Sequence, residues 1–306
     1  TFVFLFNNVL TAWFDWPGVK NLFSHYGLFG FKKLSKPLSD SVLNFAFLQL
    51  FFYLISILLA IFYVNRSIKQ TLTADSKILD KFTAYIIRSS FWAVLIVGLA
   101  DLLISFLVVE KLVEPLFGEY LKIKLVIPAF RITFVHFPLI LISFVVGYFT
   151  RSVGFIWLAV LVVASEFFIV LSRFIFEYEQ AFQGDLVRFW YSALYLFASA
   201  YALIHEGHVR VDVLYTNFSE RKKAWTNSIG SLIFGIPLCL IVLFLGMGGK
   251  ASIINGPVIS FEITQQGSNG LYLLYLMAIY LAVFAVSMLI QFTSYFMSSS
   301  DKLLKN

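Results

Sequence analysis

Long apolar stretches separated by short polar segments dominate the pattern of the chain. A helix that crosses a bilayer needs about 20 mostly apolar residues, because the hydrocarbon core is about 30 Å thick and a helix rises about 1.5 Å per residue. Seven stretches meet this requirement. The pattern therefore predicts an all-α fold, a polytopic transmembrane helix bundle with spans at about 42–64, 85–109, 125–149, 153–176, 186–204, 225–247 and 271–296.

Residues 1–41 fit this pattern less well. The apolar run from Phe2 to Phe14 is too short to cross a bilayer, and glycines and prolines interrupt residues 15–41. We interpret the segment as a truncated eighth span or as a helix that lies at the membrane interface. Inside the third predicted span, Pro128 and Pro138 predict kinks, because proline removes a backbone hydrogen bond.

The polar segment between the fifth and sixth spans predicts a short amphipathic interfacial helix. Apolar side chains recur there at i, i+3, i+4 and i+7, which places them on one helix face. These side chains are Val211, Leu214, Tyr215 and Phe218, and Ser219 supplies a capping oxygen before the basic residues Arg221, Lys222 and Lys223. We expect the helix to lie on the inner membrane surface, with its basic residues near anionic phospholipid head groups.

The composition supports a membrane protein. Of the 306 residues, 60% are apolar and 13% are charged, whereas soluble domains are about 45–50% apolar and about 25% charged. The net charge of +6 is typical of basic cytoplasmic loops on a hydrophobic chain and does not indicate nucleic-acid binding. Cys239 is the single cysteine, so no disulfide can form within the chain.

The distribution of basic residues predicts the orientation. Eleven Lys and Arg residues collect near one set of span ends and six near the other. The richer side is expected to be cytoplasmic, which places the C-terminus inside the cell. The lysines of residues 1–41 disagree with this orientation, because they fall on the outer side.

Charged residues inside the predicted spans are candidate functional residues, because charge at membrane depth is costly. They are Asp101, Arg131, Glu166 and Arg173. Pairing of Asp101 with Arg131 and of Glu166 with Arg173 explains them most simply. Contact with a partner subunit and an ion pathway through this chain are the alternatives.

The run from His205 to His208, with Asp212 beyond it, is the densest set of potential metal ligands. A helical metalloprotease motif needs two histidines four residues apart, but His205 and His208 are three apart and Gly207 interrupts them. We therefore expect no bound metal, no cofactor and no enzymatic activity. The polar groups are expected to turn the chain at the membrane–water interface.

From about residue 150 onward the chain resembles the small, DctQ-type membrane subunit of tripartite ATP-independent periplasmic (TRAP) transporters. Two motifs carry the resemblance: Asp185-Leu186-Val187-Arg188-Phe189, which is similar to an acidic-x-x-Arg-aromatic helix opening, and the His-Val-Arg-Val-Asp run from His208 to Asp212. All four helices of the family have counterparts. The resemblance implies three parts: the leader 1–41, a three-span extension 42–151 and a four-helix core 152–306.

The resemblance implies a function in sodium-coupled uptake of organic acids across the bacterial inner membrane. The expected partners are a large membrane subunit of the elevator type and a periplasmic solute-binding protein. The small subunit would be a static scaffold, in which Arg188, His208, Arg210 and Asp212 contact the partner or lipid. Two other hypotheses are an autonomous transporter or channel that uses the intramembrane charges, and an intramembrane metalloenzyme built on His205 and His208.

Overall fold

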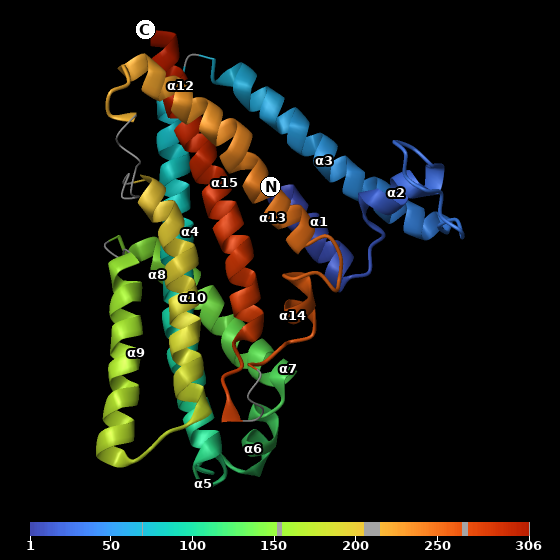
Figure 1. The fold of residues 1–306 in the computed structure, drawn as a ribbon. Helices are drawn as coiled ribbons and strands as arrows, with labels where there is room; N and C mark the ends of the chain where they lie inside the picture. Colours follow the sequence, from blue (N-terminus) through green and yellow to red (C-terminus); the bar gives the residue numbers. More distant parts are fainter. Residues whose placement is uncertain (69, 152–154, 205–214, 265–268, 306) are drawn as a thin grey trace. The chain divides into compact units, whose positions relative to one another are not determined.

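The computed structural model describes residues 1–68, 70–151, 155–204, 215–264 and 269–305, and within them all regular elements are helical (Figure 1). The predicted all-α fold is confirmed. The chain divides into two compact units. The first contains residues 1–71 with 249–251, and the second contains residues 72–248 and 252–306.

The first unit is built from α1 (Phe2–Trp13), α2 (Gly18–Tyr26) and α3 (Asp40–Arg66). α1 and α2 both pack on α3, and the completely buried Gln49 of α3 joins them. Its side chain accepts a hydrogen bond from the backbone N–H of Gly18 at 2.8 Å and donates one to the Thr11 hydroxyl at 3.0 Å. Residues 1–41 thus form two short helices, of which α1 is apolar but shorter than a span.

The second unit contains the remaining helices. They are α4 (Leu72–Val109), α5 (Val113–Phe117), α6 (Glu119–Leu125), α7 (Pro128–Arg131), η1 (Ile132–His136), α8 (Phe137–Phe149), α9 (Phe155–Phe176), α10 (Ala181–Ile204), α12 (Glu220–Gly230), η2 (Ser231–Gly235), α13 (Ile236–Gly246), α14 (Asn255–Ile259) and α15 (Leu274–Lys305). α4 packs along α8, α10 and α15, and α9 packs along α10 (Figure 1).

Six helices in the described residues are long and apolar enough to cross a membrane. They are α3, α4, α7 through α8, α9, α12 through α13, and α15. The predicted fifth span corresponds to α10, which has 24 residues. It carries buried residues along its whole length, from Phe182 to Ala200, because α4, α9 and α15 pack around it.

Two spans contain a short π-helical stretch directly before a proline. The stretch Ile132–His136 precedes Pro138, and Ser231–Gly235 precedes Pro237. At each end the backbone N–H bonds five residues back, from Phe137 to Ile132 and from Ile236 to Ser231. Proline cannot donate a backbone hydrogen bond, and the wider π turn adapts the helix to that loss.

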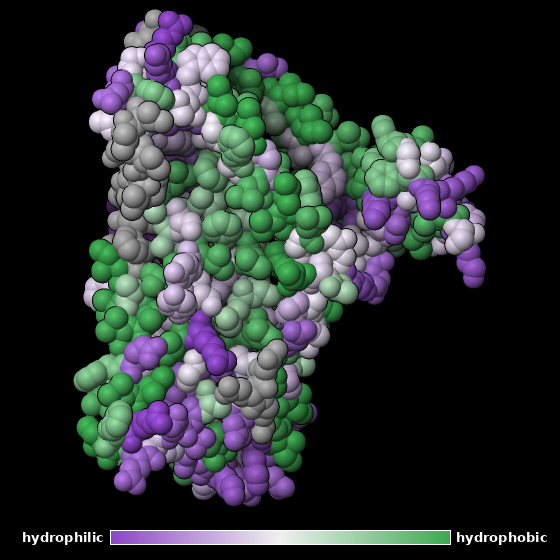
Figure 2. Space-filling model, in the orientation of Figure 1, coloured by the Kyte–Doolittle hydropathy of each residue, from purple (hydrophilic) through white to green (hydrophobic). Residues whose placement is uncertain are grey.

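The core of the second unit lies where α4, α10 and α15 meet. Phe189 of α10 packs on Tyr280 of α15 with 5.4 Å between ring centroids, and the indole N–H of Trp190 donates to the Val94 carbonyl at 3.2 Å. Gly98 of α4 permits this approach, because a Cβ atom there would lie 2.9 Å from the indole nitrogen of Trp190. Figure 2 shows hydrophobic side chains over the middle of the visible face and hydrophilic ones at its lower end, around α5 and α6.

Candidate functional site

Asp101 of α4 and Arg131 of α7 lie in direct contact, which confirms the predicted pairing. Arg131 Nε lies 2.6 Å from Asp101 Oδ1, and neither side chain is more than 1% exposed. Arg131 Nη2 also donates to the Asp101 backbone carbonyl and to the Ser105 hydroxyl, both at 2.7 Å. The guanidinium therefore reaches two points on successive turns of α4.

A histidine and two tyrosines complete this cluster. His136 Nε2 lies 2.9 Å from Asp101 Oδ1, and His136 Nδ1 lies 3.0 Å from the Tyr275 hydroxyl. The backbone N–H of Tyr272 donates to Asp101 Oδ2 at 2.7 Å, and the Arg131 guanidinium lies over the Tyr272 ring at 4.3 Å from its centroid. We call Asp101, Arg131, His136, Tyr272 and Tyr275 the buried polar cluster.

The buried polar cluster connects α4, α7, η1 and the start of α15. Its members Asp101, Arg131 and His136 are completely buried, and each contacts another member. A buried ion pair is stable only when further hydrogen bonds support it, and the cluster supplies them from Ser105, Tyr272 and His136. The cluster is suited to fixing four helical segments in register.

Glu166 differs from the other intramembrane charges. The predicted partner, Arg173, lies instead 3.4 Å from Glu179, so the predicted Glu166–Arg173 pair is wrong. The two residues share a helix face, but Arg173 is close to the end of α9 and points to the acidic loop. Within the described part of the chain, Glu166 is exposed and makes no side-chain hydrogen bond or ion pair.

Glu166 also lies at the most costly depth. It is about 11 residues from the start of α9 and 10 from its end, so roughly 15 Å of helix separates it from either end. On translocon-insertion scales, a charged residue such as Asp at the centre of a membrane helix costs about 2.5–3.5 kcal/mol. An isolated chain in lipid would therefore expose a polar carboxyl group to hydrocarbon here.

Asp185, at the start of α10, is a buried carboxylate that the sequence indicates only as part of a motif. It is 2% exposed, and its Oδ2 accepts hydrogen bonds from the Thr264 hydroxyl at 2.7 Å and the Leu271 backbone N–H at 3.1 Å. Arg188, the residue singled out by sequence, is exposed and lies 3.8 Å from Asp185. The acidic residue therefore makes the tertiary contact in this motif.

The basic residues Arg221, Lys222 and Lys223 occupy the first turn of α12, which continues into the sixth span, and not a separate surface helix as expected. Ser219 caps this helix, as predicted, by accepting from the Lys222 backbone N–H at 3.4 Å. A polar cavity of about 360 Å³ lies between α12 and α15, and Lys223 and Lys302 both line it.

The remaining sequence candidates lie outside the described residues. They are His205, His208, Arg210 and Asp212, together with Val211 and Leu214 of the predicted apolar face. Among the residues that the structure describes, no group of three or more His, Cys, Asp or Glu side chains is placed to hold a metal ion.

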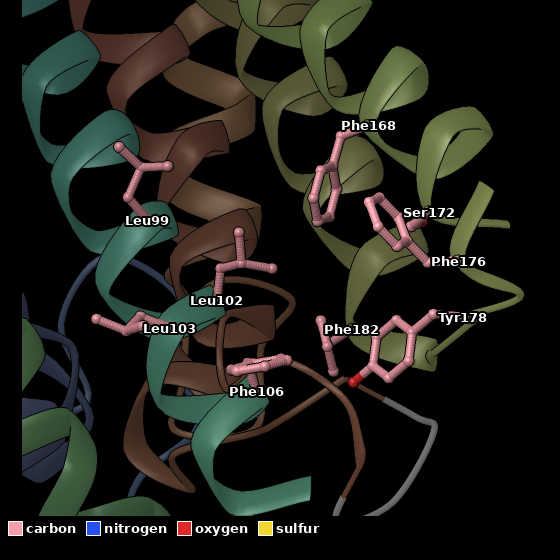
Figure 3. Close-up of a pocket in the computed structure, with 9 residues that line it drawn as sticks. All are labelled: Leu99, Leu102, Leu103, Phe106, Phe168, Ser172, Phe176, Tyr178 and Phe182. Atoms are coloured by element: carbon pink, nitrogen blue, oxygen red, sulfur yellow. The ribbon is translucent and has the colours of Figure 1, made fainter. Parts of the chain in front are cut away.

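A groove of about 400 Å³ runs between α4 and α9 (Figure 3). The rings of Phe168 and Phe176 face Leu102 and Phe106 across it. The polar side chains in its lining are Ser172 and Tyr178. The Ser172 hydroxyl already accepts a hydrogen bond from the Gln183 side-chain amide at 2.8 Å. This groove offers carbon surface, so it has no chemistry for an organic acid or an ion.

Tyr178 closes one end of the groove. Its hydroxyl donates to Glu110 at 2.7 Å, and its ring meets the edge of Phe106. Burial and the bond to Glu110 raise the pKa of Tyr178 above its usual value of 10. The phenol therefore stays protonated and joins the loop after α4 to the loop before α10.

One family model matches the chain: Tripartite ATP-independent periplasmic transporters, DctQ component, over residues 162–297. The match covers most of α9 and all of α10, α12, α13 and α14, together with most of α15. α4 and α8 precede it, although they belong to the same compact unit. No curated protein and no solved structure matches the chain.

Proposed function

Because residues 162–297 are a DctQ domain, the small membrane component of a TRAP transporter, we propose that the chain is the static scaffold of that transporter. A TRAP system also contains a large membrane subunit and a periplasmic binding protein. In the proposed mechanism, the large subunit moves like an elevator against this scaffold and carries an organic acid together with sodium. The binding protein delivers the substrate from the periplasm.

The buried polar cluster is the observation that carries the scaffold role. It joins α4 and α7, which precede the DctQ domain, to the Tyr272–Tyr275 segment inside it. α4 also packs along α10 and α15 through close contacts such as Gly98 against Trp190. Helices fixed by paired buried charges and close packing resist relative movement, which is the property that a static wall needs.

The same observation argues against the alternative of an autonomous transporter. A substrate or ion pathway needs polar groups that water or solute can reach near the middle of the membrane. Asp101, Arg131 and His136 are completely buried and in contact with one another, and the groove between α4 and α9 is lined by carbon. Neither feature resembles a pathway.

Membrane lipid is a further proposed partner, at the start of α12. Arg221 and Lys222 are exposed there, and Lys223 and Lys302 line the polar cavity. Basic side chains at the end of a membrane helix attract the phosphates of anionic phospholipids. This end of the helix is also expected to be cytoplasmic, which places the C-terminal residues of α15 inside the cell.

Co-purification tests the proposed function. The tagged chain is extracted from native membranes in mild detergent, and its partners are identified and quantified by mass spectrometry. We expect a larger multi-span permease in equal amount. The purified chain alone should show no solute uptake in liposomes under a sodium gradient. Uptake by the chain alone would refute the scaffold role and support the autonomous transporter.

A further inference from the structure

The exposed carboxylate of Glu166 lies on a defined face of α9. Positions i−7, i−3 and i+4 from Glu166 share its side of the helix, and these are Ala159, Val163 and Val170. Val163 is 68% exposed and Val170 is 48% exposed, so the face is open. We call these four residues the Glu166 face.

The Glu166 face differs from the groove face of the same helix. Phe168, Ser172 and Phe176 line the groove that lies between α9 and α4 (Figure 3). The Glu166 face instead carries one alanine and two valines around a carboxylate, and Arg173 at i+7 is paired with Glu179. Small side chains let another helix approach closely in a membrane, and a polar side chain between them forms hydrogen bonds across the interface.

We propose that the Glu166 face docks against a transmembrane helix of the large membrane subunit, which supplies a basic or other hydrogen-bond-donating side chain to Glu166. The inference rests on the proposed function, because that function requires such a partner. It adds the surface through which the contact is made and the chemistry that the partner must present at mid-membrane depth.

The charge of Glu166 decides between possible occupants of this face. Acyl chains cannot bond a carboxylate, so lipid leaves its cost uncompensated. A second copy of this chain in a two-fold interface would bring the same patch of each copy together and place Glu166 opposite Glu166. Such a pairing of like charges is unfavourable. A different helix with a donor removes the cost.

Site-specific photocrosslinking tests the location of the interface. A benzophenone amino acid replaces Val163 or Val170 in the full chain, which is co-expressed with the large permease recovered by co-purification. We expect adducts between the two subunits from both positions. Phe168 and Phe176 are controls on the same helix, because both line the groove. Phe168 lies at a depth between Val163 and Val170, whereas Phe176 is the last residue of α9. Neither should give an adduct with that permease.

Substitution of Glu166 tests the chemistry. Glu166→Leu should weaken association with the large permease by about tenfold, which corresponds to about 1.4 kcal/mol. Glu166→Gln should weaken it less, because the amide still accepts a hydrogen bond. Phe168→Leu should leave association unchanged. The isolated Glu166→Leu chain should elute and unfold like the wild type or be more stable, since its contact is with another subunit.

The outcomes distinguish failure of the proposed function from failure of this inference alone. Loss of the wild-type co-purification refutes the proposed function and this inference together. Normal co-purification with adducts from the groove positions only, or with a second copy of the chain, refutes the inference alone. Unchanged association of Glu166→Leu also refutes it, because a carboxylate that needs a partner donor cannot be replaced by a hydrocarbon without loss.

Discussion

Removal of one member of the buried polar cluster should cost far more than removal of a surface charge. In Asp101→Ala, the Arg131 guanidinium loses its counter-ion while it remains completely buried. His136 loses the acceptor of its Nε2 contact, and the Tyr272 backbone N–H loses Asp101 Oδ2, to which it donates. The perturbation thus leaves one charge and two polar groups uncompensated in an apolar surrounding.

The magnitude is set by the burial of both partners. Breaking a buried ion pair by deleting one partner typically destabilises a protein by about 3–5 kcal/mol. Arg131→Met removes the charge instead and should cost a similar amount, because Asp101 then remains buried without its cation. The double variant Asp101→Ala/Arg131→Met removes both charges, so its cost should fall below the sum of the single variants by about 2–3 kcal/mol.

The assay is reversible unfolding of the purified chain in mixed micelles by titration with sodium dodecyl sulfate. The free energies of unfolding of the wild type, both single variants and the double variant form a double-mutant cycle. Glu114→Ala is the control, because it breaks the Lys122–Glu114 ion pair, whose side chains are about half exposed. It should produce no measurable change, since exposed ion pairs contribute little.

Additive single-variant costs would refute this reasoning, because they would mean that Asp101 and Arg131 do not depend on each other. A cost for Asp101→Ala no larger than that for the Glu114 control would refute it as well. Either result would also weaken the scaffold role, since the cluster is what joins α4 to the DctQ domain.

Two further predictions concern packing and pH. Gly147→Ala should destabilise the contact of α8 with α4 by about 1–3 kcal/mol, measured by thermal unfolding, because the new Cβ would lie 2.9 Å from the Ser89 Cα; Gly184→Ala, with no atom within 4 Å, should cost nothing comparable. The pKa of Tyr178 is raised above 10 in the folded protein, so its contribution to the free energy of unfolding is present below pH 10 and is lost as the pH rises through the raised pKa. Phenolate absorbance reports the titration. Unfolding of Tyr178→Phe, which should lack this contribution, checks the direction of the pH dependence.

The sequence was sufficient for the architecture of the second unit but not for the extent of its helices. Spans could be predicted because a helix that crosses a bilayer needs a run of consecutive apolar residues, and such a run is visible in the sequence. α4 begins at Leu72, well before the predicted start near residue 85, because its first turns carry polar residues such as Ser76 that bond to Ser294 of α15. Hydropathy cannot detect a polar residue whose partner is another helix.

The same distinction explains the candidate sites. Depth in a span identified Asp101, Arg131 and Glu166, because the cost of charge in hydrocarbon depends only on position along the helix. Asp185 was overlooked as a tertiary contact, since its partners Thr264 and Leu271 are about 80 residues away in the chain. Nothing in the local pattern distinguishes a buried carboxylate at a helix start from an exposed one.

By itself, the sequence determined that this protein is a helical membrane bundle with a DctQ-like second half, and that a few charges lie at membrane depth. The tertiary structure decided which of these charges meet. It placed Asp101 against Arg131 and His136 and left Glu166 exposed. The physical reason is that apolar length is a local property of the chain, whereas pairing depends on the rotation and packing of helices that are distant in sequence.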